Sequence, residues 1–147
     1  MKANIVINKE EVLAEVARRS AYAGVKTDDA NAALFDRVAT VDEDGDLLNA
    51  YWRDGCASVA DGLKDFLAVA GFGDASLTLE LQLSDAFDAQ LLAPLQQEIF
   101  SWLTAMLLCR WFRLALPAKA TEWQAEAERL RAAVISKAYH RAAPRRR

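Results

Sequence analysis

The stretch from Pro94 to Leu116, PLQQEIFSWLTAMLLCRWFRLAL, limits the possible folds more than any other part of the chain. Placed on a helix at about 100° per residue, its large apolar side chains cover about half the circumference. Leu108 and Phe112 fall on the opposite face, among Gln97, Ser101 and Thr104. A helix that is apolar on nearly all sides lies at the centre of its own domain or is shared between partners. Leu108 and Phe112 are therefore candidate interaction residues.

A membrane span is not expected from this stretch. Its apolar run from Ile99 to Cys109 is shorter than the ~20 residues that cross a bilayer, and Glu98, Arg110 and Arg113 bracket it. The residues before Lys9 lack the apolar segment of a signal peptide. Cys56 and Cys109 are far apart in the sequence, so we interpret them as reduced thiols of a cytosolic-type protein.

The remaining pattern predicts a mainly α fold. A first helix should run from Lys9 to about Ala23, with Asn8 as its N-cap and Gly24 after it. A shorter helix should follow Thr27, anchored by Leu34, Phe35 and Val38, and a third helix should span Asp46 to about Ala70. The last helix should start at Glu122, after a capping box of Thr121 and Gln124, and end near Arg141.

Two segments have the pattern of β-strands. Residues 3–7 are β-branched and fit an edge strand, and residues 76–83 alternate leucine with polar side chains. A two-stranded element is marginal alone, so it must rest on the helices or be completed by a neighbouring subunit. The sequence thus predicts one domain of about five helices and a two-stranded element over residues 1–142, followed by a basic tail, 143–147.

The third predicted helix has two contrasting faces. Gly55 and Gly62 stand at the edge of its apolar face and suggest close approach of another helix, since glycine otherwise costs up to ~1 kcal/mol there. Asp54, Asp61 and Asp65 form an acidic stripe on the opposite side. The stripe is either a solvated surface or a docking surface for a basic element.

Charge is divided unequally along the chain, although the net charge is only -3. Residues 1–99 contain 18 acidic and 8 basic side chains, whereas residues 100–147 contain 3 acidic and 10 basic ones. The two halves should therefore face each other within a subunit, or unlike ends should meet between subunits. An acidic majority also argues against a nucleic-acid-binding role for the whole domain.

The sequence contains no recognisable catalytic or metal-binding pattern, and we expect no cofactor and no enzyme activity. His140 is the only histidine, so a Ser-His-Asp or Cys-His arrangement is not favoured. The acidic run after Val41 lacks calcium-loop spacing, because Gly45 is fourth and Arg53 twelfth from Asp42. Glu98 and Arg110 fit helix-end charges or salt-bridge partners better than active-site groups.

Three arginines, Arg145, Arg146 and Arg147, end the chain after a proline. Two interpretations stay open for them: a solvated terminus, or a non-specific contact with DNA phosphates or a partner.

In its order of elements, the chain resembles the head–tail connector (adaptor, or head-completion) proteins of long-tailed bacteriophages and prophages. The resemblance covers most of the chain: an N-terminal helical pair, an amphipathic segment ending YWRDGCASVADGLKDFL, a strand-bearing connection, a long apolar helix and a charged helix ending HRAAPRRR. It implies a non-catalytic structural subunit, found in the bacterial cytoplasm and in the virion. Such subunits form an oligomeric ring between portal and tail proteins, with DNA passing through it.

We therefore expect a homo-oligomer, with candidate contacts at Asp54, Asp61 and Asp65, at Leu108 and Phe112, and in the arginine tail. The alternative is a cytosolic helical adaptor or regulator, one that contacts nucleic acid through Arg145–Arg147. The two differ in oligomeric state, which the sequence leaves open.

Overall fold

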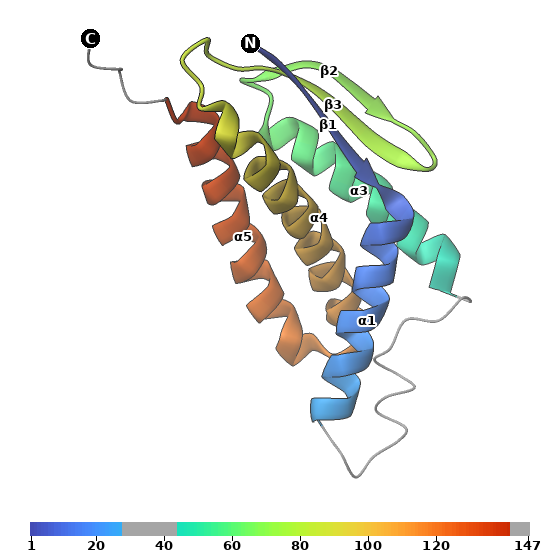
Figure 1. The fold of residues 1–147 in the computed structure, drawn as a ribbon. Helices are drawn as coiled ribbons and strands as arrows, with labels where there is room; N and C mark the ends of the chain where they lie inside the picture. Colours follow the sequence, from blue (N-terminus) through green and yellow to red (C-terminus); the bar gives the residue numbers. More distant parts are fainter. Residues whose placement is uncertain (28–43, 142–147) are drawn as a thin grey trace.

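The computed structural model describes residues 1–27 and 44–141, and this part of the chain is mainly helical with a small antiparallel sheet (Figure 1). In chain order its elements are β1 (Lys2–Asn8), α1 (Lys9–Thr27), α3 (Gly45–Gly62), β2 (Leu67–Phe72), β3 (Ser76–Gln82), the short 3₁₀ helix η2 (Ala89–Leu91), α4 (Leu92–Ala115) and α5 (Pro117–Tyr139). The mainly α prediction is confirmed. The short helix predicted after Thr27 lies outside the described residues.

The sheet has three strands in the order β1-β3-β2, all antiparallel neighbours. The pairing of β1 with β3 runs from Lys2 opposite Gln82 to Asn8 opposite Ser76. Alternate side chains of both strands are buried, as expected for a sheet with one face on a core: Ala3, Ile5, Ile7, Leu77, Leu79 and Leu81. The N-terminal strand is an edge strand, as predicted, and it pairs within the chain.

The expected two-stranded element is wrong, because the third predicted helix does not continue to Ala70. It ends at Gly62, a turn follows, and Leu67–Phe72 forms β2 against β3. The apolar spacing through Phe66 and Ala70 fits a helix, but pairing with the distant Ser76–Gln82 run decides the conformation. The hairpin turns at Gly73, whose N–H donates to the Ser76 carbonyl at 3.0 Å.

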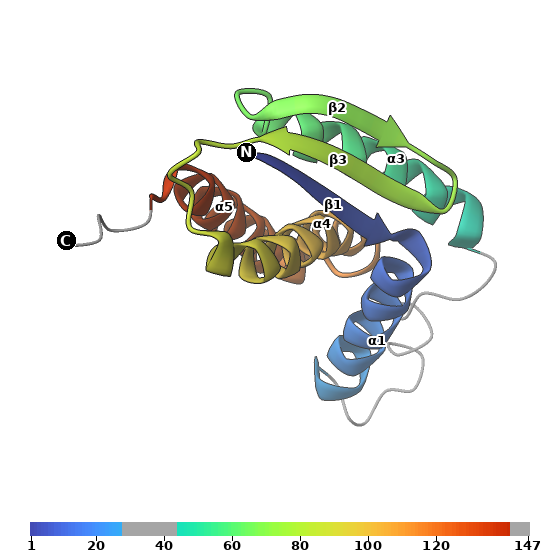
Figure 2. The ribbon, with the colours of Figure 1, turned by 45° about the horizontal axis from the view of Figure 1, so that its top comes forward.

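The long apolar helix α4 is central, as its sequence predicted. It packs against α1, α3, α5 and β1, and α3 lies beneath β2 and β3 (Figure 2). Gly55 and Gly62 of α3 mark the approach of α4. A Cβ atom at Gly55 would lie 2.7 Å from Leu103 Cδ1, and one at Gly62 would lie 2.7 Å from Trp102 Cη2. The predicted close helix approach is confirmed.

The end of α1 and the start of α5 also differ from the sequence pattern. The Asn8 side chain accepts a hydrogen bond from the Glu11 N–H at 3.2 Å, as predicted, but α1 continues through Gly24 to Thr27. The last helix begins at Pro117 instead of Glu122, so Thr121 lies inside it. Proline suits the first helical position because its fixed φ is helical and its missing N–H needs no partner there.

One hydrophobic cluster joins buried residues from every described α-helix and from β1 and β3, and the half-buried Leu67 and Ala70 of β2 pack against it. None of the described helices combines the length and apolarity needed to cross a membrane.

Candidate interaction surfaces

The acidic stripe predicted on the third helix is divided in the structure. Asp54 forms an ion pair with Arg110 of α4, with Oδ2 and Nη1 2.6 Å apart. The guanidinium of Arg110 also lies 6.0 Å from the centre of the Tyr51 ring. Asp65 lies beyond the end of α3, in the turn that leads to β2. A single helical stripe of three aspartates is therefore wrong, because the helix ends at Gly62.

Asp61 and Asp65 are exposed, and the described part of the chain gives their carboxylates no ion pair. The same holds for Arg113 on α4 and Arg131 on α5, both exposed. Exposed charges of both signs thus remain without an ion pair within residues 1–27 and 44–141.

A groove of about 540 Å³ separates α3 from α5, with α4 as its floor. Trp102 and Met106 form the apolar floor, and small residues of α3 such as Gly55 and Ser58 form one wall. Asp61, Arg110, Arg113, Glu128 and Arg131 line the same groove. It therefore presents acidic and basic groups together, an arrangement suited to a protein surface of mixed charge rather than to one anion or cation.

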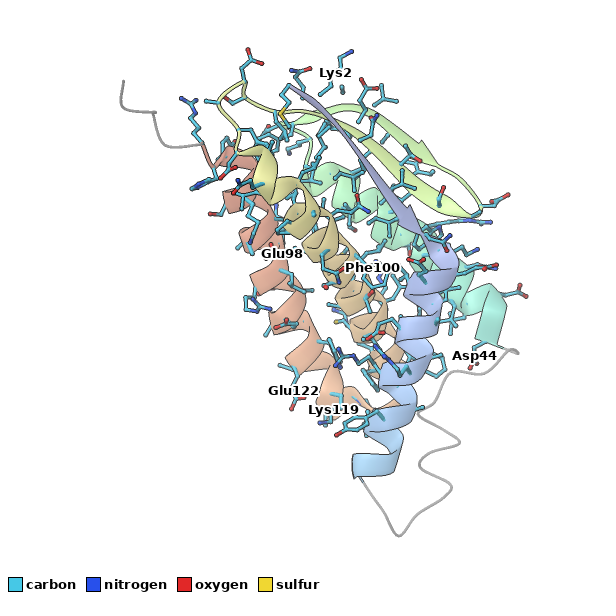
Figure 3. All side chains as sticks on the ribbon, in the orientation of Figure 1. Lys2, Asp44, Glu98, Phe100, Lys119 and Glu122 are labelled. Carbon is cyan, nitrogen blue, oxygen red and sulfur yellow. The ribbon has the colours of Figure 1, made fainter. Side chains whose placement is uncertain are left out.

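A second groove, of about 840 Å³, lies between α1 and α5 over the other side of α4. Figure 3 shows Phe100 on α4 facing this groove. Lys119 and Glu122, near the start of α5, line its other side. Its charged side chains are largely paired with each other. Glu15 binds Arg18 and Arg19, and Lys119 lies 3.4 Å from Glu122.

Leu108 and Phe112, predicted as interaction candidates, belong to the hydrophobic core of the chain itself. Each has 0% of its surface exposed, since α4 is covered on several sides by elements of its own chain. The sequence left two positions open for a helix that is apolar on nearly all sides: the centre of its own domain, or a contact with a partner. The structure shows α4 at the centre of its own domain. Arg145, Arg146 and Arg147 lie outside the described residues.

The charged residues at the ends of the apolar run form salt bridges, as expected. Glu98 Oε1 lies 2.6 Å from Nζ of Lys137 on α5, and both side chains are only about a quarter exposed (26% and 27%). The second carboxylate oxygen, Oε2, is buried without a hydrogen-bond partner in the described part of the chain. The Glu98–Lys137 salt bridge thus connects α4 to α5.

Other reactive groups do not converge on a site within the described residues. Burial raises the pKa of the Cys56 thiol to about 12, an effect that the nearby Lys9 charge reduces only in part, so the thiol is protonated at neutral pH. His140 is exposed at the end of α5. Over residues 1–27 and 44–141, no cluster of three or more His, Cys, Asp or Glu side chains is placed to hold a metal ion.

The sequence pattern missed one exposed surface, the edge of the sheet at β2. Val69 and Phe72 have 58% and 57% of their surface exposed, although both are large and apolar. The uncharged run LAVAGF, followed by Gly73 and Asp74, is a hairpin signal that could have identified this edge.

Comparisons with protein-family models, with curated proteins and with solved structures find no match to this chain.

Proposed function

We propose that the protein is a non-catalytic structural subunit of a phage or prophage particle, a connector that forms an oligomeric ring between portal and tail. In this proposal the protein occurs in the bacterial cytoplasm before assembly and in the virion afterwards. The proposal rests on the resemblance in element order and on the charges that remain unpaired on the surface.

The observation that carries the proposal is the presence of unpaired charges of both signs on one subunit. Two ion pairs between the acidic and basic halves are made internally, Asp54–Arg110 and Glu98–Lys137. Asp61 and Asp65 remain unpaired within the described residues, and so do Arg113 and Arg131.

Such a surface favours contact between unlike patches of neighbouring copies. A heterologous contact, in which one patch meets a different patch, generates a ring when the rotation closes. Asp61 and Asp65 of one subunit would face basic side chains of the next. Because these side chains are exposed, complementary charge contributes more to specificity and to association rate than to raw affinity.

The test is the mass of the protein in solution, measured by light scattering over a range of protein and salt concentrations. The wild-type chain should form a closed oligomer whose mass is a fixed multiple of 16.2 kDa. The double variant Asp61→Lys/Asp65→Lys should shift this mass toward that of the single chain. The reversed charges would repel the basic side chains that Asp61 and Asp65 are proposed to face on the next copy.

Glu10→Lys/Glu11→Lys is the matched control, since it makes the same charge change at two exposed acids of α1. It should keep the oligomer. An assembly that tolerates the aspartate reversal would contradict docking through these charges. A monomer under every condition would instead favour the adaptor or regulator, and a DNA mobility shift that disappears on deletion of Arg145–Arg147 would then support nucleic-acid contact.

A further inference from the structure

Helix α5 has one face that the described residues leave exposed along its whole length. The helix packs mainly against α4, and Figure 1 shows it at one side of the helix layer with α4 as its neighbour. Its buried stripe contains Ala127, Leu130 and Val134. The outer face lies about 180° around the helix from this stripe. It consists of exposed residues only: Ala118, Thr121, Ala125, Glu128, Arg129, Ala132, Ser136 and Tyr139.

Charged side chains border the centre of the outer face on two flanks. On the flank toward α1, Glu126 lines the α1–α5 groove, and its Oε1 lies 2.5 Å from Nη2 of Arg129. On the flank toward α3, Glu128 and Arg131 line the α3–α5 groove. Each flank therefore carries one acid, followed three residues later by one base.

The other charged side chains of α5 are paired within the chain. Nζ of Lys119 lies 3.4 Å from Oε2 of Glu122, and Nζ of Lys137 lies 2.6 Å from Oε1 of Glu98 on α4. His140 and Arg141 come after the end of the helix. The charges of α5 that border the centre of its outer face are therefore two acids and two bases: Glu126, Glu128, Arg129 and Arg131.

This charge pattern indicates α5 of a second copy, running antiparallel, as the occupant of the outer face. A two-fold axis between Glu128 and Arg129 places each flank of one helix beside the same flank of the other. Each flank then gathers two glutamates and two arginines, a neutral set in which every acid has a base of the second copy nearby. A partner of a single charge sign would instead meet like charges on both flanks.

The same axis matches the sizes of side chains along the outer face. It places Tyr139, which is 60% exposed, opposite Ala118, so the largest side chain of the face meets one of the smallest. It also places Ala125 opposite Ala132. Alanine at both positions lets two helix axes approach to about 8 Å, the lower end of the usual range. Charge and shape thus agree on one register.

We propose that two copies of the protein associate by antiparallel pairing of their α5 helices through the outer face. The inference goes beyond the proposed connector ring, because it does not use Asp61 and Asp65. The contact is isologous and links copies in pairs, whereas a ring needs a heterologous contact. One helix pair is small beside the ~1,600 Å² of a standard stable interface, so the dimer should be weak and concentration-dependent.

Light scattering on charge-reversed proteins tests the pairing. Every protein in the series carries Asp61→Lys/Asp65→Lys, which removes the charges proposed for the ring contact. In about 0.1 M salt the screening length is about 10 Å, so charges in contact still interact. The mass of this parent should rise from that of the single chain, 16.2 kDa, toward twice that value as the protein concentration increases.

Two opposite reversals on α5 should each abolish the dimer. With Glu126→Lys/Glu128→Lys, each flank of the pair gathers four bases, and with Arg129→Glu/Arg131→Glu it gathers four acids. Repulsion between the two copies should then hold either protein at the mass of the single chain over the same range of concentration.

An equimolar mixture of the two reversed proteins is the decisive measurement. The introduced lysines of one protein then face the introduced glutamates of the other, and each flank again holds two acids and two bases. The mixture should regain the concentration-dependent dimer that neither protein forms alone. Such recovery would also show that both reversed proteins are folded.

Glu10→Lys/Glu11→Lys, added to the same parent, is the matched control. It makes the same change from acid to base at two exposed residues of α1, away from the outer face of α5. It should dimerise as the parent does.

Four results would overturn the inference. The first is a parent that stays at the mass of the single chain at every concentration. The second is a dimer that persists in either reversed protein, which would place the contact elsewhere. The third is a mixture that stays monomeric while both reversed proteins melt at the temperature of the parent. The fourth is equal loss of the dimer in the α1 control. The ring is tested separately, by the wild-type mass, because every protein compared here lacks Asp61 and Asp65.

Discussion

At the residue scale, Trp52 on α3 and Leu103 on α4 are the side chains whose removal should affect stability most clearly. Their exposed fractions are 3% and 0%, and both belong to the one hydrophobic cluster. Truncating such a side chain removes apolar contacts and leaves a cavity, which typically lowers the free energy of unfolding by about 2–5 kcal/mol. We expect a loss of this size for Trp52→Ala and for Leu103→Ala, measured by urea denaturation.

Leu114→Ala is the matched control for these two variants. Leu114 lies on the same helix as Leu103 but has 65% of its surface exposed, so its truncation should change the free energy of unfolding by about 0.5 kcal/mol or less. Near-wild-type stability of Trp52→Ala or Leu103→Ala would contradict the assignment of the buried faces of α3 and α4.

At the element scale, the attachment of α5 to α4 depends on a salt bridge with little exposure. Lys137→Met removes the partner of Glu98, whose Oε2 already lacks a hydrogen bond within the described residues. A partly buried carboxylate left without its cation should lower the free energy of unfolding by about 1–3 kcal/mol. Arg110→Met leaves Asp54, which is 55% exposed, to be solvated by water, and should lower it by at most about 1 kcal/mol.

Urea denaturation of both variants, and of Glu98→Gln with and without Lys137→Met, measures these differences. In the double variant neither charge remains, so much of the loss should be recovered relative to Lys137→Met alone. Equal stability of Lys137→Met and Arg110→Met would show that the burial of Glu98 does not matter energetically.

The sequence predicted best those helices and strands whose residue pattern is contained in the segment itself. Alternation of leucines identified β3, the β-branched run identified β1, and continuous apolarity identified the central α4. The glycine pair in α3 also predicted the close approach of another helix, since the Cβ positions of Gly55 and Gly62 meet α4 side chains. Each of these features depends on residues within a single helix or strand.

Features that depend on distant contacts were missed. The segment Leu67–Phe72 has helical apolar spacing, and only its pairing with β3 makes it a strand. The same error extended the acidic stripe to Asp65, which lies past the true helix end. Leu108 and Phe112 were only candidates for an interaction, because the sequence alone does not show how many elements surround α4. The candidate surfaces therefore changed more than the fold class did.

At the scale of the whole molecule, α5 raises the question of whether the chain unfolds as one unit. It packs mainly against α4, and the two grooves separate it from α1 and from α3. Its buried stripe of Ala127, Leu130, Val134 and Ala138 nevertheless joins the same hydrophobic cluster as the sheet and α3. A shared core favours a single cooperative transition, as in most domains of this size.

Tryptophans on three helices make this expectation measurable. Trp52 lies on α3, Trp102 and Trp111 on α4, and Trp123 on α5. Urea unfolding followed by tryptophan fluorescence and by far-ultraviolet circular dichroism should give coincident transitions with one midpoint. Val134→Ala, which truncates a fully buried residue of α5, should lower the midpoint equally for both probes.

Separate midpoints would mean that the chain does not unfold as one unit, and would contradict the single domain predicted for residues 1–142. The measurement should be repeated at several protein concentrations, because association of the folded chain raises its apparent stability by mass action. A midpoint that rises with protein concentration would show that association stabilises the folded chain.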